Sequence, residues 1–342
     1  MSHLRVSSLI VATFVAAATA RALDICLPTA NDALLRPGGD ADFFQPTVEG
    51  TVESGMFGCV RVNGHRFHEG IDIKCLRRDR RGEPIDPVHA VADGAVAFVN
   101  PRPGLSNYGR YVVLQHRWDE VPVCTLYAHL SEVARGLIPG QPVKKGQVIG
   151  VLGHSANTRE GIPRDRAHLH FEINFLLNPN FYIWYPKHDP DAPPFGNFNG
   201  QNLIGLDPAA FLRAYAANRE LNFAQYVSKQ PVAFTALVGA RPLPWLKLHP
   251  EQVHPANGTP IAYEIGMTYW GMPVAVWPRA AGEIDEPHRR VLQHGLPVVM
   301  RVNEVELARA TCQELVKPAR RGTGWTLSKR GQECFELLAY TP

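Results

Sequence analysis

Three histidine-containing motifs stand out because of their residue types and their order along the chain. They are Phe67–Asp72 (Phe-His-Glu-Gly-Ile-Asp), Leu126–Leu130 (Leu-Tyr-Ala-His-Leu) and Ala167–Glu172 (Ala-His-Leu-His-Phe-Glu). Together they offer imidazoles and carboxylates, from which a catalytic zinc ion usually takes three ligands while one position stays open for water. Each motif alone carries a high risk of coincidence. Their occurrence in order, within one stretch rich in predicted strands, indicates a zinc hydrolase.

The third motif predicts a strand, because apolar and polar residues alternate from Arg166 to Phe175. Residues two apart on a strand point to the same face of a sheet. We therefore expect His168 and His170 to face one cleft together with Glu172. The Glu172 carboxylate either accepts a hydrogen bond from a histidine and fixes its tautomer, or is an ordinary solvated strand residue.

The first motif needs a bend to bring its two candidate ligands together. In a straight strand, four residues span about 13 Å at 3.3 Å per residue, which is too far for His68 and Asp72 to bind one ion. A helix would bring them close, but Gly70 and the neighbouring Ile71 and Ile73 disfavour a helix. We expect the chain to bend between His68 and Asp72, with Gly70 permitting the bend.

The order of these motifs resembles the lysostaphin-type zinc endopeptidases, which cut the peptide part of bacterial peptidoglycan. The resemblance covers about Gly55 to Leu212 and includes two further segments, Val88–Val96 and Val143–Gly150. One departure from the family pattern is a polar insertion, Arg159–Arg166, between the Gly153–Thr158 turn and the His-Leu-His strand. The insertion predicts a longer loop beside the cleft that leaves the zinc site intact, so the resemblance does not fix the groove shape or the bond that is cleaved.

The resemblance implies roles for five residues. It implies His68, Asp72 and His170 as zinc ligands. It also implies His129 and His168 as the pair that positions and deprotonates the zinc-bound water and steadies the oxyanion. All five are present, which favours an active enzyme.

The leading hypothesis is an exported zinc metalloendopeptidase that hydrolyses peptide bonds of peptidoglycan, in the stem peptide or the cross-bridge, with a zinc-activated water. One alternative is a non-catalytic peptidoglycan-binding or regulatory protein on the same fold. Another is a lipoyl- or biotin-carrier-like domain, because Val143–Gly150 also resembles such modules. A carrier needs a lysine in an exposed Met-Lys turn, which the sequence lacks.

Short β-type segments divided by glycine and proline recur along the chain and predict a mainly β protein with antiparallel sheets. We expect a peptidase domain over residues 46–217, closed by a capped helix at Asp207–Tyr215. A second, mostly β domain of unknown function follows over 222–342. Because the five site residues precede it, we expect it to be dispensable for the chemistry and to anchor the substrate. The aromatic segment Asn178–Gly200 is either a groove wall or a lid on the core.

The first twenty residues have the layout of a secretory signal peptide: a basic residue, an apolar run and a small-residue cleavage site. Residues 21–45 are then an N-terminal extension. The apolar run is too short for a transmembrane helix, and no later stretch is long enough to span a bilayer. These features predict a protein exported to the periplasm or medium and associated with the cell envelope.

The six cysteines predict disulfides if the protein is exported, although some could remain buried thiols. Their spacing suggests Cys312 with Cys334, Cys59 with Cys75, and Cys26 with Cys124.

The formal net charge of +3 is mild. Two short basic runs, Arg77–Arg81 and Lys317–Arg321, come without any recognisable nucleic-acid-binding module. We expect peptidoglycan peptides as partners and no nucleic acid.

Overall fold

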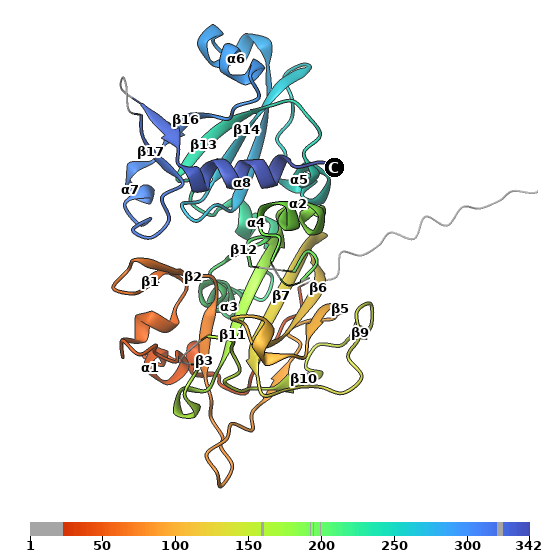
Figure 1. Cartoon of the computed structure of the whole chain (residues 1–342), viewed down its shortest axis with the longest axis vertical. Helices are drawn as coiled ribbons and strands as arrows, with labels where there is room; N and C mark the ends of the chain where they lie inside the picture. The colour runs from red at the N-terminus through yellow and green to blue at the C-terminus, as the bar shows by residue number, and fades with distance from the viewer. Residues whose placement is uncertain (1–22, 159–160, 192, 194, 199, 320–323) are drawn as a thin grey trace, which may run out of the picture.

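The computed structural model describes residues 23–158, 161–191, 193, 195–198, 200–319 and 324–342. The predicted signal peptide and residues 21–22 of the predicted extension lie outside this part. Residues 159–160 of the predicted insertion and residues 192, 194 and 199 of the predicted aromatic segment also lie outside it. Figure 1 shows a lower unit that contains β1 to β12 and an upper unit that contains β13 to β18. Among the described residues, no helix is long and apolar enough to cross a bilayer.

The strands of the lower unit are short except for four long ones near its centre. They are β1 (Gly58–Arg61), β2 (Arg66–His68), β3 (Ile71–Lys74), β4 (Pro87–His89), β5 (Gly94–Asn100), β6 (Arg110–Trp118), β7 (Val121–Leu130), β8 (Glu132–Val133), β9 (Pro142–Val143), β10 (Val148–Val151), β11 (His168–Leu176) and β12 (Leu203–Leu206). The helices before the upper sheet are α1 (Asp40–Phe43), α2 (Phe181–His188), α3 (Pro208–Ala217) and α4 (Phe223–Ser228).

The upper unit contains β13 (Phe234–Gly239), β14 (Pro260–Met267), β15 (Pro273–Ala280), β16 (Val298–Val302), β17 (Val316–Pro318) and β18 (Trp325–Leu327). Its helices are α5 (Pro244–Leu248), α6 (Glu286–Gln293), α7 (Glu304–Leu307) and α8 (Lys329–Ala339). Short 3-10 helices occur at Ala33–Leu35, Val52–Gly55, Pro103–Leu105, Arg164–Arg166, Pro250–Gln252 and Ala281–Glu283.

A seven-stranded antiparallel sheet organises the lower unit, in the order β12-β11-β7-β6-β5-β9, with β3 also paired to β11. The first half of β11 lies between β3 and β7, and its second half lies between β7 and β12. Every residue of β11 from His168 to Phe175 is buried. The predicted mainly β, antiparallel fold is confirmed, and β11 is the strand around which the candidate site is built.

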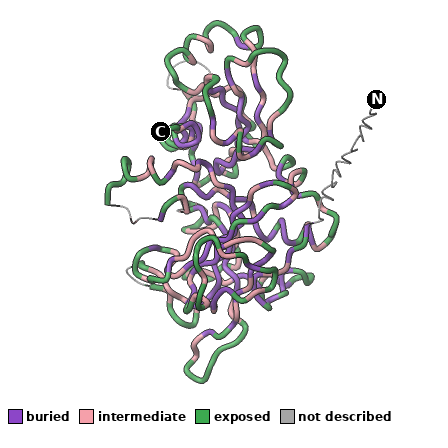
Figure 2. The backbone as a smooth tube through the Cα atoms, turned by 90° about the vertical axis from the view of Figure 1, so that its right-hand side faces the viewer, coloured by how far each residue is buried: buried purple, intermediate pink, exposed green. Residues whose placement is uncertain are grey.

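The upper unit adds a four-stranded antiparallel sheet, β15-β14-β13-β16, and a two-stranded pair, β17-β18. This confirms a second β region after the first sheet. Helix α8, which the sequence reasoning missed, packs Phe335 against Phe234 of β13 with ring centroids 6.4 Å apart. One cluster of buried apolar side chains includes residues of both units, and Figure 2 shows buried backbone continuing between them.

The ends of the lower unit are fixed by specific hydrogen bonds. The predicted helix near Asp207 is confirmed as α3, and the Asp207 carboxylate accepts from the backbone N–H of Ala209 and Ala210 at 2.9 and 3.1 Å. From the same helix, the Tyr215 hydroxyl donates to Leu23 O at 2.9 Å. The segment before β1 is thereby held against the helix that follows β12.

The predicted cysteine pairing is wrong. Cys59 of β1 forms a disulfide with Cys312, which lies between α7 and β17, with a Cα–Cα distance of 5.5 Å. The other four cysteines, Cys26, Cys75, Cys124 and Cys334, are free thiols. The two bonded residues are 253 positions apart, so the partner depends on how the two units pack and not on local spacing.

Candidate metal centre

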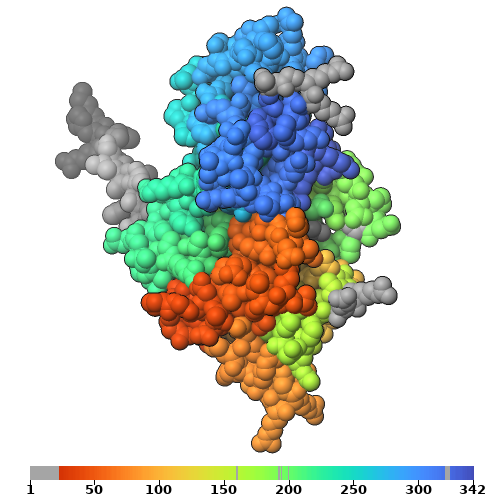
Figure 3. Space-filling view, turned by 90° about the vertical axis from the view of Figure 1, so that its left-hand side faces the viewer, coloured from red at the N-terminus to blue at the C-terminus, as the bar shows by residue number. Residues whose placement is uncertain are grey.

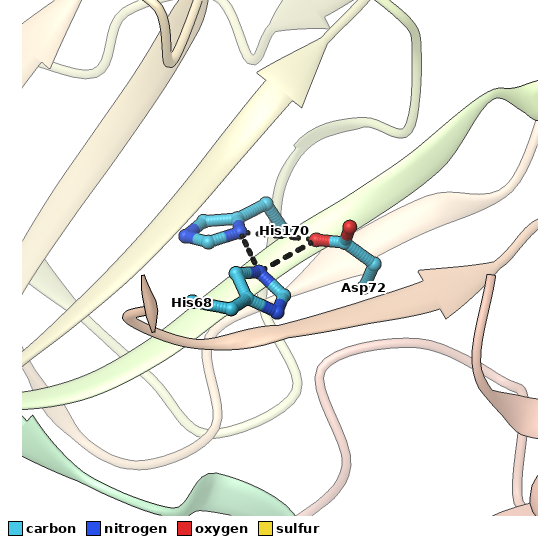
Figure 4. Close-up of side chains that lie close together, drawn as sticks. All are labelled: His68, Asp72 and His170. Carbon is cyan, nitrogen blue, oxygen red and sulfur yellow. Dashed lines mark hydrogen bonds and ion pairs between the residues drawn. The ribbon is translucent and has the colours of Figure 1, made fainter. Parts of the chain in front are cut away.

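Three neighbouring strands bring the three candidate ligands together. His68 is the last residue of β2, Asp72 lies in β3 and His170 lies in β11, where it is paired directly with Asp72. Their exposed fractions are 0%, 2% and 4%, respectively. Figure 4 shows both imidazole rings and the carboxylate converging on one point.

The distances between the converging atoms fit a single metal ion. His68 Nε2 lies 3.0 Å from His170 Nδ1 and 3.1 Å from Asp72 Oδ1, and the last two atoms are 3.0 Å apart. Zinc binds imidazole nitrogen and carboxylate oxygen at about 2.0–2.2 Å. An ion slightly out of the plane of this triangle can reach all three atoms at such distances, and two imidazoles with one carboxylate are a donor set that zinc commonly takes.

The bend expected between His68 and Asp72 is present, but its cause is different from the one predicted. Strand β2 ends at His68 and β3 begins at Ile71, so two residues make the connection. Gly70 does not have a positive φ. A Cβ atom there would lie 2.4 Å from Phe171 O. Glycine is required because β11 passes this close to the connection.

His129 and His168 lie beside the cluster, with ring centroids 4.9 Å apart, and His168 Nε2 is 3.5 Å from Asp72 Oδ2. Nδ1 of His129 donates to Ser155 O at 2.9 Å, and Nδ1 of His168 donates to Arg166 O at 2.7 Å. Since Nδ1 carries the proton in each neutral ring, Nε2 is left as the proton acceptor. The His129 and His170 centroids are 5.7 Å apart. The structure therefore gathers all five predicted site residues in one place.

His129 adopts a backbone conformation that is rare for a residue with a side chain, with φ of 60°. Its N–H donates to Tyr108 O at 2.9 Å, and its carbonyl oxygen would lie 2.8 Å from a Cβ at Gly153. The surrounding backbone thus holds this residue closely. Residues kept in sparsely populated φ/ψ regions cluster at functional sites.

Buried polar side chains support the His170 ring from behind. Its Nε2 donates to Glu172 Oε1 at 2.7 Å, and Asn174 Nδ2 donates to the other carboxylate oxygen at 2.6 Å. The Tyr108 hydroxyl also bonds this carboxylate. Glu172 is 0% exposed, so it is a hydrogen-bonding partner of histidine and not a solvated strand residue. Its bond fixes the proton on Nε2 and leaves Nδ1 as the nitrogen that can bind a metal.

Arg61 of β1 is a site residue that the sequence reasoning missed. Its guanidinium donates to Asp72 Oδ2 and lies 2.8 Å from His68 Nε2. Because His68 Nδ1 donates to Met56 O at 2.6 Å, its Nε2 is free to accept. The motif around His68 gives no signal for Arg61, because the residue reaches the site only through the β1–β2 hairpin.

Burial and hydrogen bonding shift the pKa values of the site histidines in opposite directions. Burial lowers the pKa of His68 to about 4 and also lowers the pKa values of His129 and His168. Burial acts in the same direction on His170, but its bonds to Asp72 and Glu172 outweigh it and raise the pKa to about 9.

The buried Asp72 carboxylate stays ionised for a related reason. Burial alone favours the neutral acid, yet the adjacent Arg61 guanidinium and the hydrogen bond with His170 hold the pKa of this carboxyl well below the usual range. At neutral pH the site therefore presents an ionised Asp72 oxygen and neutral rings at His68, His129 and His168, whereas His170 is protonated and must release the Nδ1 proton when a metal ion binds.

A cavity of about 1010 Å³ opens over this cluster. Asp72, His129, His168 and His170 contribute to its floor. Trp184 and Tyr185 of α2 line it, which makes the predicted aromatic segment a cleft wall. The insertion before β11 contributes Ile162 and Arg166. Residues of the upper unit also line the cavity: Trp270, Gln313, Leu315, Lys329, Arg330, Glu333, Cys334 and Leu337.

The buried His68/Asp72/His170 cluster on this antiparallel β fold is a candidate metal site. Residues 66–179 match the sequence model of Peptidase family M23. This segment contains all five site residues, and the match confirms the resemblance inferred from the motifs. A comparison with curated protein sequences gives no match.

Solved structures similar to this chain include peptidases of three bacteria. A zinc containing peptidase from Vibrio cholerae is 29% identical over 31% of this chain and 26% of its own, with a TM-score of 0.23. A putative glycyl-glycine endopeptidase LytM from Ruminococcus gnavus is 26% identical over 47% and 51%, with a TM-score of 0.31. The catalytic domain of the antimicrobial peptidase lysostaphin from Staphylococcus simulans is 24% identical over 46% and 87%, with a TM-score of 0.28. This chain matches about a quarter of the length of the Vibrio cholerae peptidase and about half of the length of the Ruminococcus gnavus protein.

Proposed function

We propose that this protein is an exported zinc metalloendopeptidase that hydrolyses peptide bonds of bacterial peptidoglycan. The observation that carries the proposal is the convergence of His68 Nε2, Asp72 Oδ1 and His170 Nδ1, within about 3 Å of one another, at the floor of a large cavity. The match of residues 66–179 to the M23 peptidase family supports peptide-bond hydrolysis. The Cys59–Cys312 disulfide supports an oxidising compartment outside the cytoplasm.

His68, Asp72 and His170 would hold the zinc ion. When bound, zinc lowers the pKa of a coordinated water to about 7 and polarises the carbonyl of the scissile bond. Glu172 keeps the His170 ring oriented through Nε2, and Arg61 holds Asp72 through Oδ2. These contacts let Nδ1 of His170 and Oδ1 of Asp72 present fixed lone pairs to the same point.

His129 and His168 would carry out the proton transfers. Each is held as a neutral ring with Nδ1 bonded to a backbone carbonyl, so Nε2 can accept the proton of the attacking water. Once protonated, Nε2 can donate to the oxyanion or pass the proton to the leaving amine. Burial lowers the pKa of both rings, so both start the reaction in the basic form at neutral pH.

The test separates metal binding from catalysis. The full chain should bind one zinc ion and release peptides from purified peptidoglycan. His129→Ala and His168→Ala should each retain zinc and lose about 10²- to 10⁴-fold in turnover, the usual contribution of a general acid–base group. His65→Ala is a matched control because His65 is exposed and lies outside the cavity. Near wild-type turnover in both site variants would remove His129 and His168 from the proposed proton transfers, whereas a zinc-loaded wild type that releases no peptides would favour a non-catalytic binding protein.

A further inference from the structure

The upper unit forms one wall of the cavity that contains the metal centre. Gln313, Leu315 and the first turn of α8 line the same cavity as His129 and His170. Figure 3 shows the surface of the β1–β2 region directly against the C-terminal residues. This arrangement argues against the expectation that the second unit is only an anchor, because a peptide in the cleft would contact both units.

Covalent and polar contacts fix this wall to the peptidase unit. The Cys59–Cys312 disulfide joins the residue before Gln313 to β1. Beside it, Thr311 Oγ1 donates to Gly64 O at 2.7 Å. At the other end of the wall, Asn178 Nδ2 donates to Leu337 O of α8 at 2.7 Å. A wall held at both ends can place side chains at defined positions relative to the metal centre.

Gln313 has an unsatisfied polar group at the cavity. Gln313 is only 3% exposed, and its Oε1 atom has no hydrogen-bond partner within the described residues. A buried polar atom without a partner costs about 1–3 kcal/mol. A peptide amide bound in the cleft would supply the missing partner, with either orientation of the Gln313 amide group.

The charged side chains around the cavity are mostly cationic. Arg61 and Asp72 are paired with each other at the floor. The remaining described cations that line the cavity are Arg66, Arg166, Lys329 and Arg330, and the anions are Glu69 and Glu333.

The two cations of the upper wall are concentrated at one helix end. Lys329 and Arg330 are the first two residues of α8, and both are exposed. The Lys329 side chain is 92% exposed and lies 3.7 Å from Glu333, a contact too long and too exposed to neutralise it. The N-terminal end of a helix adds a partial positive charge that attracts anions.

We propose that this wall binds a free carboxylate of the peptide substrate through Lys329 and Arg330, while Gln313 bonds the peptide backbone. The inference rests on the proposed function, since it assigns a substrate feature to the same cleft. A carboxylate is the anionic group that a peptide offers. Guanidinium and ammonium groups bind it with charge-assisted hydrogen bonds.

The experiment measures binding separately from turnover. The zinc-loaded full chain carrying His129→Ala is titrated with a fluorescent peptidoglycan tetrapeptide, and with the same peptide whose carboxylates are all converted to carboxamides. We expect about tenfold tighter binding of the carboxylate form, which corresponds to about 1.4 kcal/mol. Adding K329Q and R330Q should remove this preference and leave the zinc content unchanged. Gln313→Ala should weaken both peptides about equally.

The control variant removes two positive charges at a site away from the cavity. Arg289 and Arg290 on α6 pair with Glu286 and do not line the cavity. R289Q with R290Q should therefore keep the carboxylate preference. If the preference survives K329Q with R330Q, or if the control variant loses it equally, the inference is overturned.

Turnover of the two peptides by the otherwise unchanged zinc protein tests the proposed function independently. Binding with carboxylate preference but without cleavage would contradict the proposed function and leave the wall assignment standing. Cleavage of both peptides without any preference in binding would support the function and overturn the assignment.

Discussion

The imidazole of His170 is held on both sides, with Nε2 2.7 Å from Glu172 Oε1 and Nδ1 3.0 Å from Asp72 Oδ1. Glu172 is 0% exposed and also accepts from Asn174. A buried carboxylate behind a metal-binding histidine fixes the ring orientation and increases the basicity of the other nitrogen. The position of the candidate ligand atom thus depends on a residue that would not touch the metal.

Two substitutions of Glu172 should therefore weaken zinc binding to different extents. Glu172→Gln keeps an acceptor for His170 Nε2 but loses the negative charge, whereas Glu172→Leu removes both. We expect a modest loss of zinc affinity for the first variant and about 10- to 100-fold for the second. Competition with a fluorescent chelator measures both. Equal affinities in all three proteins would show that Glu172 does not support the site.

Asp72→Ala should remove stoichiometric zinc, because the two remaining histidines leave the centre with too few protein ligands. Elemental analysis of the purified variant measures the effect. Asp165→Ala is a suitable control, since Asp165 is exposed in the insertion before β11 and is not part of the ligand cluster. One zinc per chain in Asp72→Ala would remove Asp72 from the proposed ligand set.

The residues that the sequence could identify are those that act through short motifs. His68, Asp72, His168 and His170 lie in two such motifs, and their local spacing on strands and bends already limits where they point. Arg61 was missed because it reaches Asp72 only after β1 folds back on β2.

The second wall of the cleft could not be predicted for a related reason. Gln313 and Lys329 follow β3 by more than two hundred residues in the chain, and only the packing of the two units places them at the cavity. The same packing joins Cys59 to Cys312. Local patterns predict elements and motif sites, whereas contacts between units depend on the complete fold.

The disulfide should stabilise the closed arrangement of the two units. Replacing both Cys59 and Cys312 by alanine should lower the free energy of unfolding by about 2–5 kcal/mol, as for other native disulfides that close long loops. Denaturant unfolding without reductant measures this loss, and Cys75→Ala, at a free thiol, is the control. Mass mapping of the unreduced protein should find Cys59 linked to Cys312. A Cys312–Cys334 link would contradict the structure.

His116 should make the folded protein sensitive to acid. It is 4% exposed, and its Nδ1 and Nε2 lie 2.9 Å from Asp93 O and 2.8 Å from Thr125 Oγ1. Burial lowers its pKa from 6.5 to about 4. Above pH 6.5 the ring is neutral in both the folded and the unfolded chain, so it adds no pH dependence.

Between pH 6.5 and about 4 the unfolded chain binds a proton at His116 that the folded protein does not. The free energy of unfolding should then fall by up to about 1.4 kcal/mol per pH unit from this residue, or about 3 kcal/mol in total. His68, His129 and His168 add to the acid sensitivity and His170 opposes it, so the share of His116 is the difference between the wild type and His116→Gln. Denaturant unfolding of the metal-free proteins at several pH values measures it. His116→Gln should show the shallower pH dependence, and His65→Gln, at an exposed position, should match the wild type. An unchanged slope in His116→Gln would mean that this ring is protonated in the folded protein or is not buried in the way the structure shows.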